Sequence, residues 1–183
     1  MGSTLGPPQH ALRGADRERR LAVEDWLLKA ARNRQTAAAE WGHQGVALLT
    51  AGRVWDVVRA PYTVLTPTFD RNAAPGELRR RVLELRVPGA VFCAYYRPHL
   101  YVLVPPGADR HWPHRDCPPG VECLGAAQTY MHYIGVPRLD RTEPPGPFWL
   151  IPPDHRRRLA DPEQLYAALR ACTERPDQMP GAP

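Results

Sequence analysis

Residues 90–104 read AVFCAYYRPHLYVLV, and this stretch decides the fold. Two runs rich in β-branched and aromatic residues, 90–96 and 99–104, are separated only by Arg97 and Pro98. Such runs joined by a tight turn predict two antiparallel strands in a hairpin. A proline at the second position of a two-residue turn is unusual, yet these two runs carry the clearest strand signals of the chain.

Helical and extended patterns lie on both sides of this hairpin. Apolar residues at helical spacing predict helices over residues 16–34, 36–41 and 77–85. A short apolar run occupies 46–49, and strands are predicted over 54–58, 129–134 and 148–151. Asp161, Pro162 and Gln164 form an N-cap and capping box ahead of a last helix.

These elements predict an α+β fold with a mostly antiparallel sheet flanked by helices. We expect one domain over 15–172, a flexible leader over 1–14 and a flexible tail over 173–183. The chain has 183 residues, of which 43% are hydrophobic and 23% charged, so it can bury one ordinary core.

Composition excludes several classes of protein. No apolar run approaches the roughly 20 residues that cross a bilayer, and the first twenty residues lack the apolar core of a secretory signal. The four cysteines are therefore expected to be reduced thiols in the cytoplasm. A membrane span, a fibrous protein and a disulfide-dense miniprotein are excluded.

Arginine supplies nearly all of the positive charge. The formal net charge is +5, Lys29 is the only lysine, and arginine runs lie at 79–81 and 156–158. The arginine guanidinium forms bidentate hydrogen bonds to phosphate and stacks on bases, so DNA, RNA or a nucleotide is a candidate partner. The alternative for each run is a solvated helix face.

Three residues are candidates for chemistry. Asp56 lies in the apolar run VWDVV, His99 opens the run HLYVLV, and Glu122 lies between apolar residues just before Gly125. An acid inside an apolar strand needs a partner, a hydrogen bond or a metal. The structural alternatives are a carboxylate paired with an arginine and a histidine satisfied within the fold.

Together, these motifs resemble the bifunctional DNA primase/polymerase domain of the archaeo-eukaryotic primase superfamily. The resemblance covers residues 37–160 and is greatest to short actinobacterial proteins of that description. Active members have an acid-x-acid motif on a strand, a glycine-rich histidine motif often followed by Leu-Tyr-Phe, and a third acid near a glycine. Here His99, Leu100 and Tyr101 match the second motif, while Asp56 and Glu122 stand where the first and third acids are expected.

The departures from the family pattern predict a decayed active site. With Asp56 as the first acid, its partner position holds Val58; in the other register, Arg59 and Pro61 hold both acid positions. Two-metal nucleotidyl transfer needs several carboxylate oxygens, and Asp56 with Glu122 would hold one Mg²⁺ or Mn²⁺ at most.

The resemblance therefore implies a non-catalytic protein that binds a nucleotide or nucleic acid through Arg53, Arg97, His99 and Tyr101. Two alternatives stay open. One is a metal-dependent primase/polymerase with Asp56, His99 and Glu122 as catalytic residues. The other is a protein-interaction or regulatory subunit without a ligand, whose partner would be another protein.

A second constellation has the side chains of a structural zinc site. His111, His114, Cys117 and Cys123 follow the pattern H-x2-H-x2-C-x5-C inside a proline-rich loop. Zinc takes four such ligands in tetrahedral geometry. The alternative is a loop that contains histidine and cysteine without a metal.

Overall fold

The computed structural model describes residues 9–94, 96–127 and 130–174. The α-helices of these ranges are α1 Gln9–Leu28, α2 Arg34–Gln44, α3 Pro75–Glu84 and α4 Pro162–Glu174, with 3-10 turns η1 Tyr62–Val64 and η2 Ala108–Arg110. The strands are β1 Val46–Thr50, β2 Asp56–Pro61, β3 Val91–Ala94, β4 His99–Val104, β5 Glu122–Leu124, β6 Tyr133–Pro137 and β7 Phe148–Ile151. The predicted α+β class is confirmed.

The strands form two antiparallel sheets. The larger sheet has the strand order β5-β2-β4-β3-β7, and the smaller one pairs β1 with β6. The predicted hairpin is confirmed, because β3 and β4 pair antiparallel at the middle of the larger sheet. This hairpin places β4 beside β2, with Asp56 opposite Val104 and Pro61 opposite His99.

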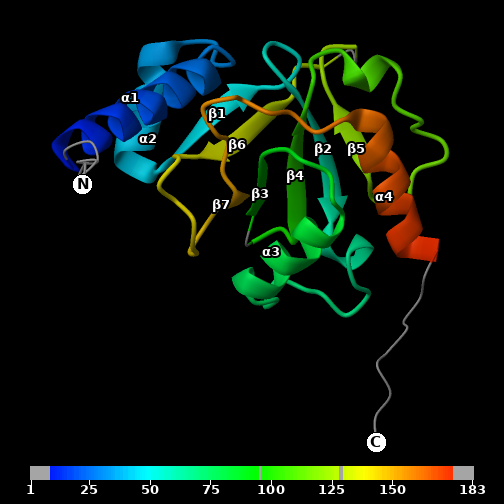
Figure 1. Cartoon of the computed structure of the whole chain (residues 1–183). Helices are drawn as coiled ribbons and strands as arrows, with labels where there is room; N and C mark the ends of the chain where they lie inside the picture. The colour runs from blue at the N-terminus through cyan, green and yellow to red at the C-terminus, as the bar shows by residue number, and fades with distance from the viewer. Residues whose placement is uncertain (1–8, 95, 128–129, 175–183) are drawn as a thin grey trace, which may run out of the picture.

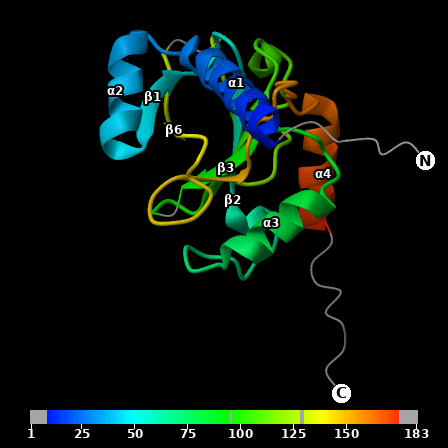
Figure 2. The same cartoon turned by 60° about the vertical axis from the view of Figure 1, so that its left-hand side comes forward.

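Two apolar cores lie on the two faces of the larger sheet. On one face, Val58 and Val102 pack with Leu78 of α3 and Leu165 of α4. On the other face, a second core joins Leu103 and Val57 to α1, α2 and the smaller sheet. Figures 1 and 2 show this division: α3 and α4 lie on one side of the larger sheet, and α1, α2 and the β1–β6 pair on the other.

Local signals set the ends of α2 and α4. The Asn33 side chain accepts a hydrogen bond from the Thr36 amide at 3.1 Å and starts α2. That helix passes through Gly42, where the sequence predicted its end, and stops at Gly45, whose φ of 70° is left-handed. The predicted cap of α4 is confirmed, because Asp161 Oδ1 accepts a hydrogen bond from the Gln164 amide at 2.8 Å.

Other boundaries differ from the prediction. Helix α1 begins at Gln9, inside the expected leader, and ends at Leu28 rather than at residue 34. Its end is fixed by a turn in which the Ala30 amide donates to the Leu27 carbonyl at 3.0 Å. The last helix continues to Glu174, past the expected start of the tail. Residues 1–8 and 175–183 lie outside the described ranges.

Strand β2 is displaced along the chain from its predicted position at 54–58. The Gly52 amide donates to the Trp55 carbonyl at 2.8 Å, so residues 52–55 form a turn and the strand begins at Asp56. It continues through Arg59 to Pro61, three residues beyond its predicted end at residue 58. Strand β6 likewise begins at Tyr133; residue 129, where it was expected to begin, lies outside the described ranges.

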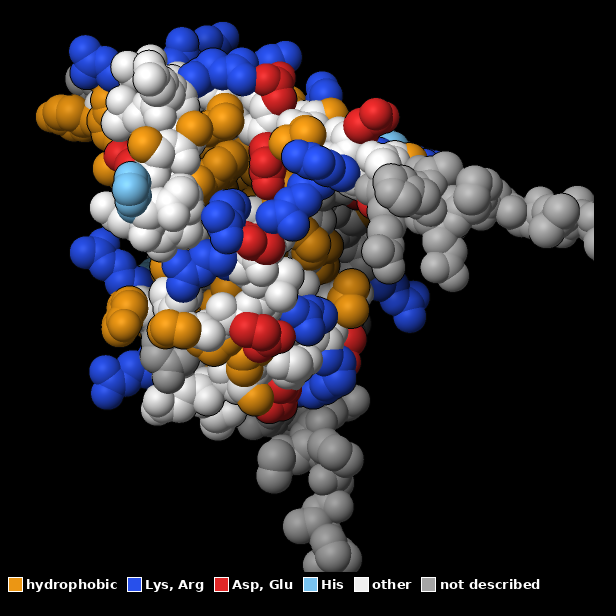
Figure 3. Space-filling model, turned by 90° about the vertical axis from the view of Figure 1, so that its left-hand side faces the viewer, with side chains coloured by type: hydrophobic (Ala, Val, Ile, Leu, Met, Phe, Trp, Pro, Cys, Tyr) orange, Lys and Arg blue, Asp and Glu red, His pale blue; other side chains and the backbone are white. Residues whose placement is uncertain are grey.

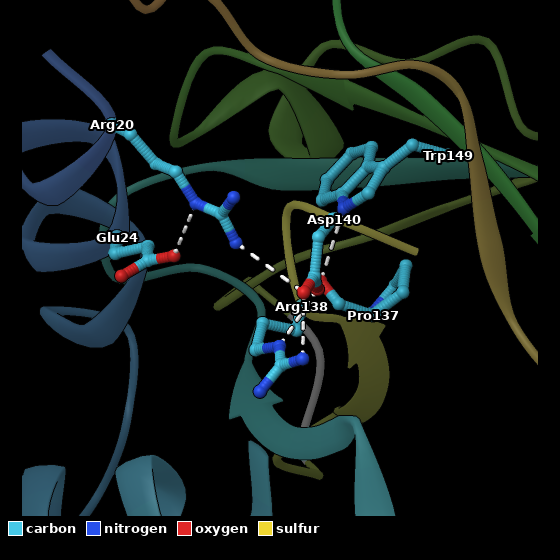
Figure 4. A network of polar contacts seen from close by, with 6 residues as sticks. All are labelled: Arg20, Glu24, Pro137, Arg138, Asp140 and Trp149. Carbon is cyan, nitrogen blue, oxygen red and sulfur yellow. Dashed lines mark hydrogen bonds and ion pairs between the residues drawn. The ribbon is translucent and has the colours of Figure 1, made fainter. Parts of the chain in front are cut away.

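An ion-pair network fastens α1 to the segment between β6 and β7 (Figure 4). Arg138 contacts both carboxylate oxygens of Asp140, at 2.7 and 2.6 Å, and Arg20 Nη2 lies 3.4 Å from the same carboxylate. Beside it, Trp149 Nε1 donates to the Pro137 carbonyl at 3.0 Å. None of the helices in the described ranges is long and apolar enough to cross a bilayer.

Candidate functional site: an open-sheet cluster and a buried acid pair

The structure does not bring the three candidate catalytic residues together. Asp56 and His99 lie at opposite ends of the β2–β4 pairing, about 16 Å apart along the strands. Side chains alternate between faces, so Asp56 shares the face of Val58, while Glu122 lies opposite Arg59 on the other face. Asp56 and Glu122 therefore cannot share one metal ion in this fold.

His99 and Glu122 instead lie near Arg59. Arg59 stands opposite Tyr101 in β4 and opposite Glu122 in β5, and its Nη2 lies 2.7 Å from Glu122 Oε1. His99 lies two residues before Tyr101 in β4. Its side chain is therefore on the same face of the sheet as those of Tyr101 and Arg59. The sequence left two registers open for the acid-x-acid motif. The positions that lie beside His99 are those of Arg59 and Pro61, not those of Asp56 and Val58.

We call Arg59, Arg97, His99, Tyr101 and Glu122 the open-sheet cluster. Its side chains are half-buried or exposed. Burial lowers the pKa of His99, and the charge of Arg59 lowers it further. Burial raises the pKa of Tyr101, while the positive charges of Arg59 and Arg97 oppose that rise. The histidine is thus held toward its neutral form beside two guanidinium groups.

Aromatic packing fixes the position of Tyr101. Its ring stacks on Phe92 with centroids 4.8 Å apart and planes 4° apart. Phe92 in turn meets Trp149 edge-on at 5.1 Å, and both of these rings are fully buried in the second core. This row of rings holds the tyrosine on the sheet as a rigid side chain, which favours its use as a contact surface.

The predicted binding residues divide into two groups. Arg97, His99 and Tyr101 belong to the open-sheet cluster. Arg53 lies on the turn before β2, at the other end of the sheet, where its Nη1 donates to the Ala31 carbonyl at 2.8 Å. The four residues therefore do not form one site.

Asp56 has a partner that the sequence did not reveal. Its Oδ2 accepts a hydrogen bond from the Asp109 amide at 3.0 Å, and both aspartates are buried. Asp109 Oδ2 accepts a further bond from the Ala127 amide at 2.6 Å. Burial raises the pKa of Asp56 to about 6, and the neighbouring Asp109 carboxyl adds to the rise. We call these two residues the buried acid pair.

The two carboxyl groups lie close against Gly125. A Cβ built on Gly125 would lie 2.4 Å from Asp109 Cγ and 2.6 Å from Asp56 Cγ, so only glycine fits there. Oδ1 of each aspartate is buried with no hydrogen-bond donor.

Two of the predicted zinc ligands have protein partners. His114 Nε2 lies 3.0 Å from the Asp109 carbonyl oxygen, and Trp112 Nε1 donates to Cys117 Sγ at 2.9 Å. Cys123 is fully buried in β5. Across the part of the chain that the structure describes, no group of three or more His, Cys, Asp and Glu side chains is arranged to hold a metal ion. Zinc, magnesium and manganese binding stay predictions.

The arginine runs have acidic partners within the protein. In α3, Arg80 Nη1 lies 2.6 Å from Glu84 Oε1, and after β7 Arg158 Nη2 lies 2.9 Å from Asp154 Oδ2. On the face that carries α1 and α2, arginine side chains likewise have acidic side chains among them (Figure 3). These pairs fit a solvated surface. Arg59 is paired in the same way with Glu122, so the exposed Arg97 is the guanidinium of the open-sheet cluster that is most accessible to an anion.

Sequence reasoning missed Asp109 as a site residue and gave Arg59 no role of its own. Asp109 is one of two acids in the proline- and glycine-rich loop over 105–120, and it lies 53 residues after Asp56, whose side chain accepts its amide hydrogen bond. No spacing rule connects such residues before the strand register is known. In comparisons with known proteins, no family model, no curated protein and no solved structure matched the chain.

Proposed function

We propose that the protein binds single-stranded nucleic acid or a nucleotide at the open-sheet cluster and does not catalyse nucleotidyl transfer. The observation that carries the proposal is the position of Arg59. It lies beside His99, where the family resemblance expects a metal-binding acid, and is paired with Glu122 at 2.7 Å. A guanidinium in that position attracts a phosphate and repels a metal cation.

Each member of the cluster has a role in this proposal. Arg97 and Arg59 would contact phosphate oxygens, and His99 would donate or accept one hydrogen bond in its neutral form. Tyr101, already held by Phe92, offers its remaining ring surface to a base. Exposed Tyr96, in the same turn as Arg97, adds a second ring at the edge.

In the catalytic alternative, Glu122 has the opposite effect on ligand binding. A metal-dependent polymerase would use that carboxylate to hold the ion, so its loss would abolish ligand binding that depends on metal. In the binding proposal, Glu122 neutralises Arg59 and weakens the attraction for phosphate. The replacement Glu122→Gln therefore separates the two functions.

The direct test is the salt dependence of binding. Fluorescence anisotropy would measure affinity for labelled single-stranded DNA and RNA 12-mers at several salt concentrations. Arg97→Gln should weaken binding roughly tenfold and lower the slope of log K against log salt by about 1, because one phosphate contact is lost.

The matched control is Arg170→Gln. Arg170 pairs with Glu174 at 2.6 Å on α4, which packs on the opposite face of the sheet, so its loss should leave affinity unchanged. Absence of salt-dependent binding in the unaltered protein would refute the proposal and favour the protein-interaction alternative. The proposal places the protein in the cytoplasm, where its cysteines, all free thiols, would stay reduced.

A further inference from the structure

A hollow of about 470 Å³ lies at the end of the larger sheet opposite to the open-sheet cluster. It is bounded by the turn at Gly52 and Arg53, by Arg32 after α1, by Gly125 after β5, and by Tyr130 and Met131 just before β6 and Tyr133 at its start. We call it the Gly125 hollow. Its size is that of a site for a small molecule rather than for a peptide or a strand.

Among the described residues that line the Gly125 hollow, the two charged side chains are both arginines. Arg32 is exposed, and Arg53 is oriented by its hydrogen bond to the Ala31 carbonyl at 2.8 Å. Arg32 and Arg53 both line the Gly125 hollow, although they come from different segments of the chain. Two guanidinium groups, with no acid among the described residues of the lining, attract a small anion such as a carboxylate or phosphate.

The remaining wall is aromatic and apolar. Tyr130 is 78% exposed, Met131 65% and Tyr133 45%, and all three line the hollow. Large side chains of this kind gathered at one cavity are typical of a surface that a ligand covers. Tyrosine and methionine both pack well against planar rings.

The floor of the hollow is closely packed. Gly125 lies directly on the buried acid pair, and Asp109 holds the Ala127 amide at 2.6 Å. A Cβ on Gly52 would lie 2.5 Å from the Ala126 amide nitrogen, so the two loops are in close contact. A cavity held in this way needs little reorganisation to accept a ligand, which favours affinity.

From this geometry we infer that the Gly125 hollow binds a small aromatic anion, in which a planar ring is joined to a carboxylate or phosphate. The anionic group lies between Arg32 and Arg53, and the ring lies against Tyr130 and Tyr133. An aromatic acid and a mononucleotide share this chemistry. The site is separate from the open-sheet cluster and does not depend on nucleic-acid binding there.

The test is a ligand-observed NMR titration of the full chain with four probes. These are 2-naphthoate, its neutral analogue 2-naphthamide, adenosine monophosphate and inorganic phosphate. We expect saturable binding of 2-naphthoate or adenosine monophosphate, at least tenfold weaker binding of 2-naphthamide, and weak binding of phosphate alone. If 2-naphthoate binds more tightly than adenosine monophosphate, the ligand is an aromatic acid. The reverse order indicates a mononucleotide.

Variants separate this site from the open-sheet cluster. Arg32→Gln and Arg53→Gln should each weaken binding of the aromatic anion at least fivefold, whereas Arg170→Gln, on α4 and away from both sites, should leave it unchanged. Arg32 is exposed, so its replacement remains informative if loss of the Arg53 hydrogen bond disturbs folding.

Three results would overturn the inference: no binding of either anion at millimolar concentration, equal binding of 2-naphthamide, or full binding by Arg32→Gln. None of them bears on the salt-dependent binding of oligonucleotides, which is tested by Arg97→Gln.

Discussion

Replacing Asp56 with asparagine should raise the stability of the protein at neutral pH and flatten its pH dependence. The side chain is fully buried and shares its surroundings with a second carboxyl group, Asp109. An amide keeps the shape of the carboxyl and its oxygen can still accept the Asp109 amide hydrogen bond. It removes the charge that burial opposes and supplies a donor toward the neighbouring carboxylate.

The magnitude follows from the pKa of Asp56, which burial raises from 3.8 to about 6. At about 1.4 kcal/mol per pKa unit, the difference corresponds to about 3 kcal/mol. A carboxyl with a raised folded-state pKa contributes its stability below the unfolded value of 3.8. That contribution is lost as the pH rises to about 6, because the unfolded chain ionises first.

The assay is urea denaturation followed by tryptophan fluorescence at pH values from 4 to 8. The unaltered protein should lose up to about 3 kcal/mol of unfolding free energy between pH 4 and 6 from this group, and Asp56→Asn should remove most of that loss. A variant profile as steep as that of the unaltered protein would refute the reasoning, as would a lower stability of the variant at pH 7.

Asp140→Asn is the matched control. The bidentate contact with Arg138 lowers the pKa of Asp140, whereas burial raises the pKa of Asp56. The stability that the Asp140 carboxylate contributes is present above its unfolded-state pKa of 3.8. It is lost as the pH falls through its lowered pKa in the folded protein. The control should therefore change stability by less than about 1 kcal/mol at neutral pH, since the pair is partly exposed.

Three further outcomes are expected. Glu122→Gln should tighten oligonucleotide binding about threefold, measured by anisotropy, because it frees a guanidinium charge; weaker binding would favour the metal-dependent alternative. Gly125→Ala should cost roughly 1–3 kcal/mol in urea denaturation, because its Cβ would lie 2.4 Å from Asp109 Cγ, whereas Gly76→Ala, with open space around it, should cost little. Asp161→Ala should lose about 1 kcal/mol and lower the melting temperature, since it removes the α4 cap; an unchanged melting temperature would show that this cap is dispensable.

Elements with a local cause could be predicted from the sequence. Strand β4 begins at His99, where the proline turn ends, and β7 occupies its predicted range. The α4 cap depends on Asp161 and the three residues after it. By contrast, β5 has three residues and no periodic signal, and it becomes a strand only because β2 lies beside it.

The candidate site depends on information that the sequence alone does not contain. A shift of β2 by two residues decides which of its side chains lie near His99, and that shift follows from the turn at Gly52. The pairing of Asp56 with Asp109 requires a long loop to fold back over the sheet. Residue types therefore indicated an acid that needs a partner, while the strand register and loop path determined which partner it has.

The smaller sheet has a consequence for the order of folding. Val46 pairs with Pro137, so the β1–β6 contact closes a segment of roughly ninety residues, and loop closure over that length is slow compared with a hairpin. The β3–β4 hairpin closes a few residues and can form first. We expect a nascent chain that ends before β6 to leave β1 without a partner, with the apolar side chains of α1 and α2 exposed to chaperones until synthesis passes Pro137.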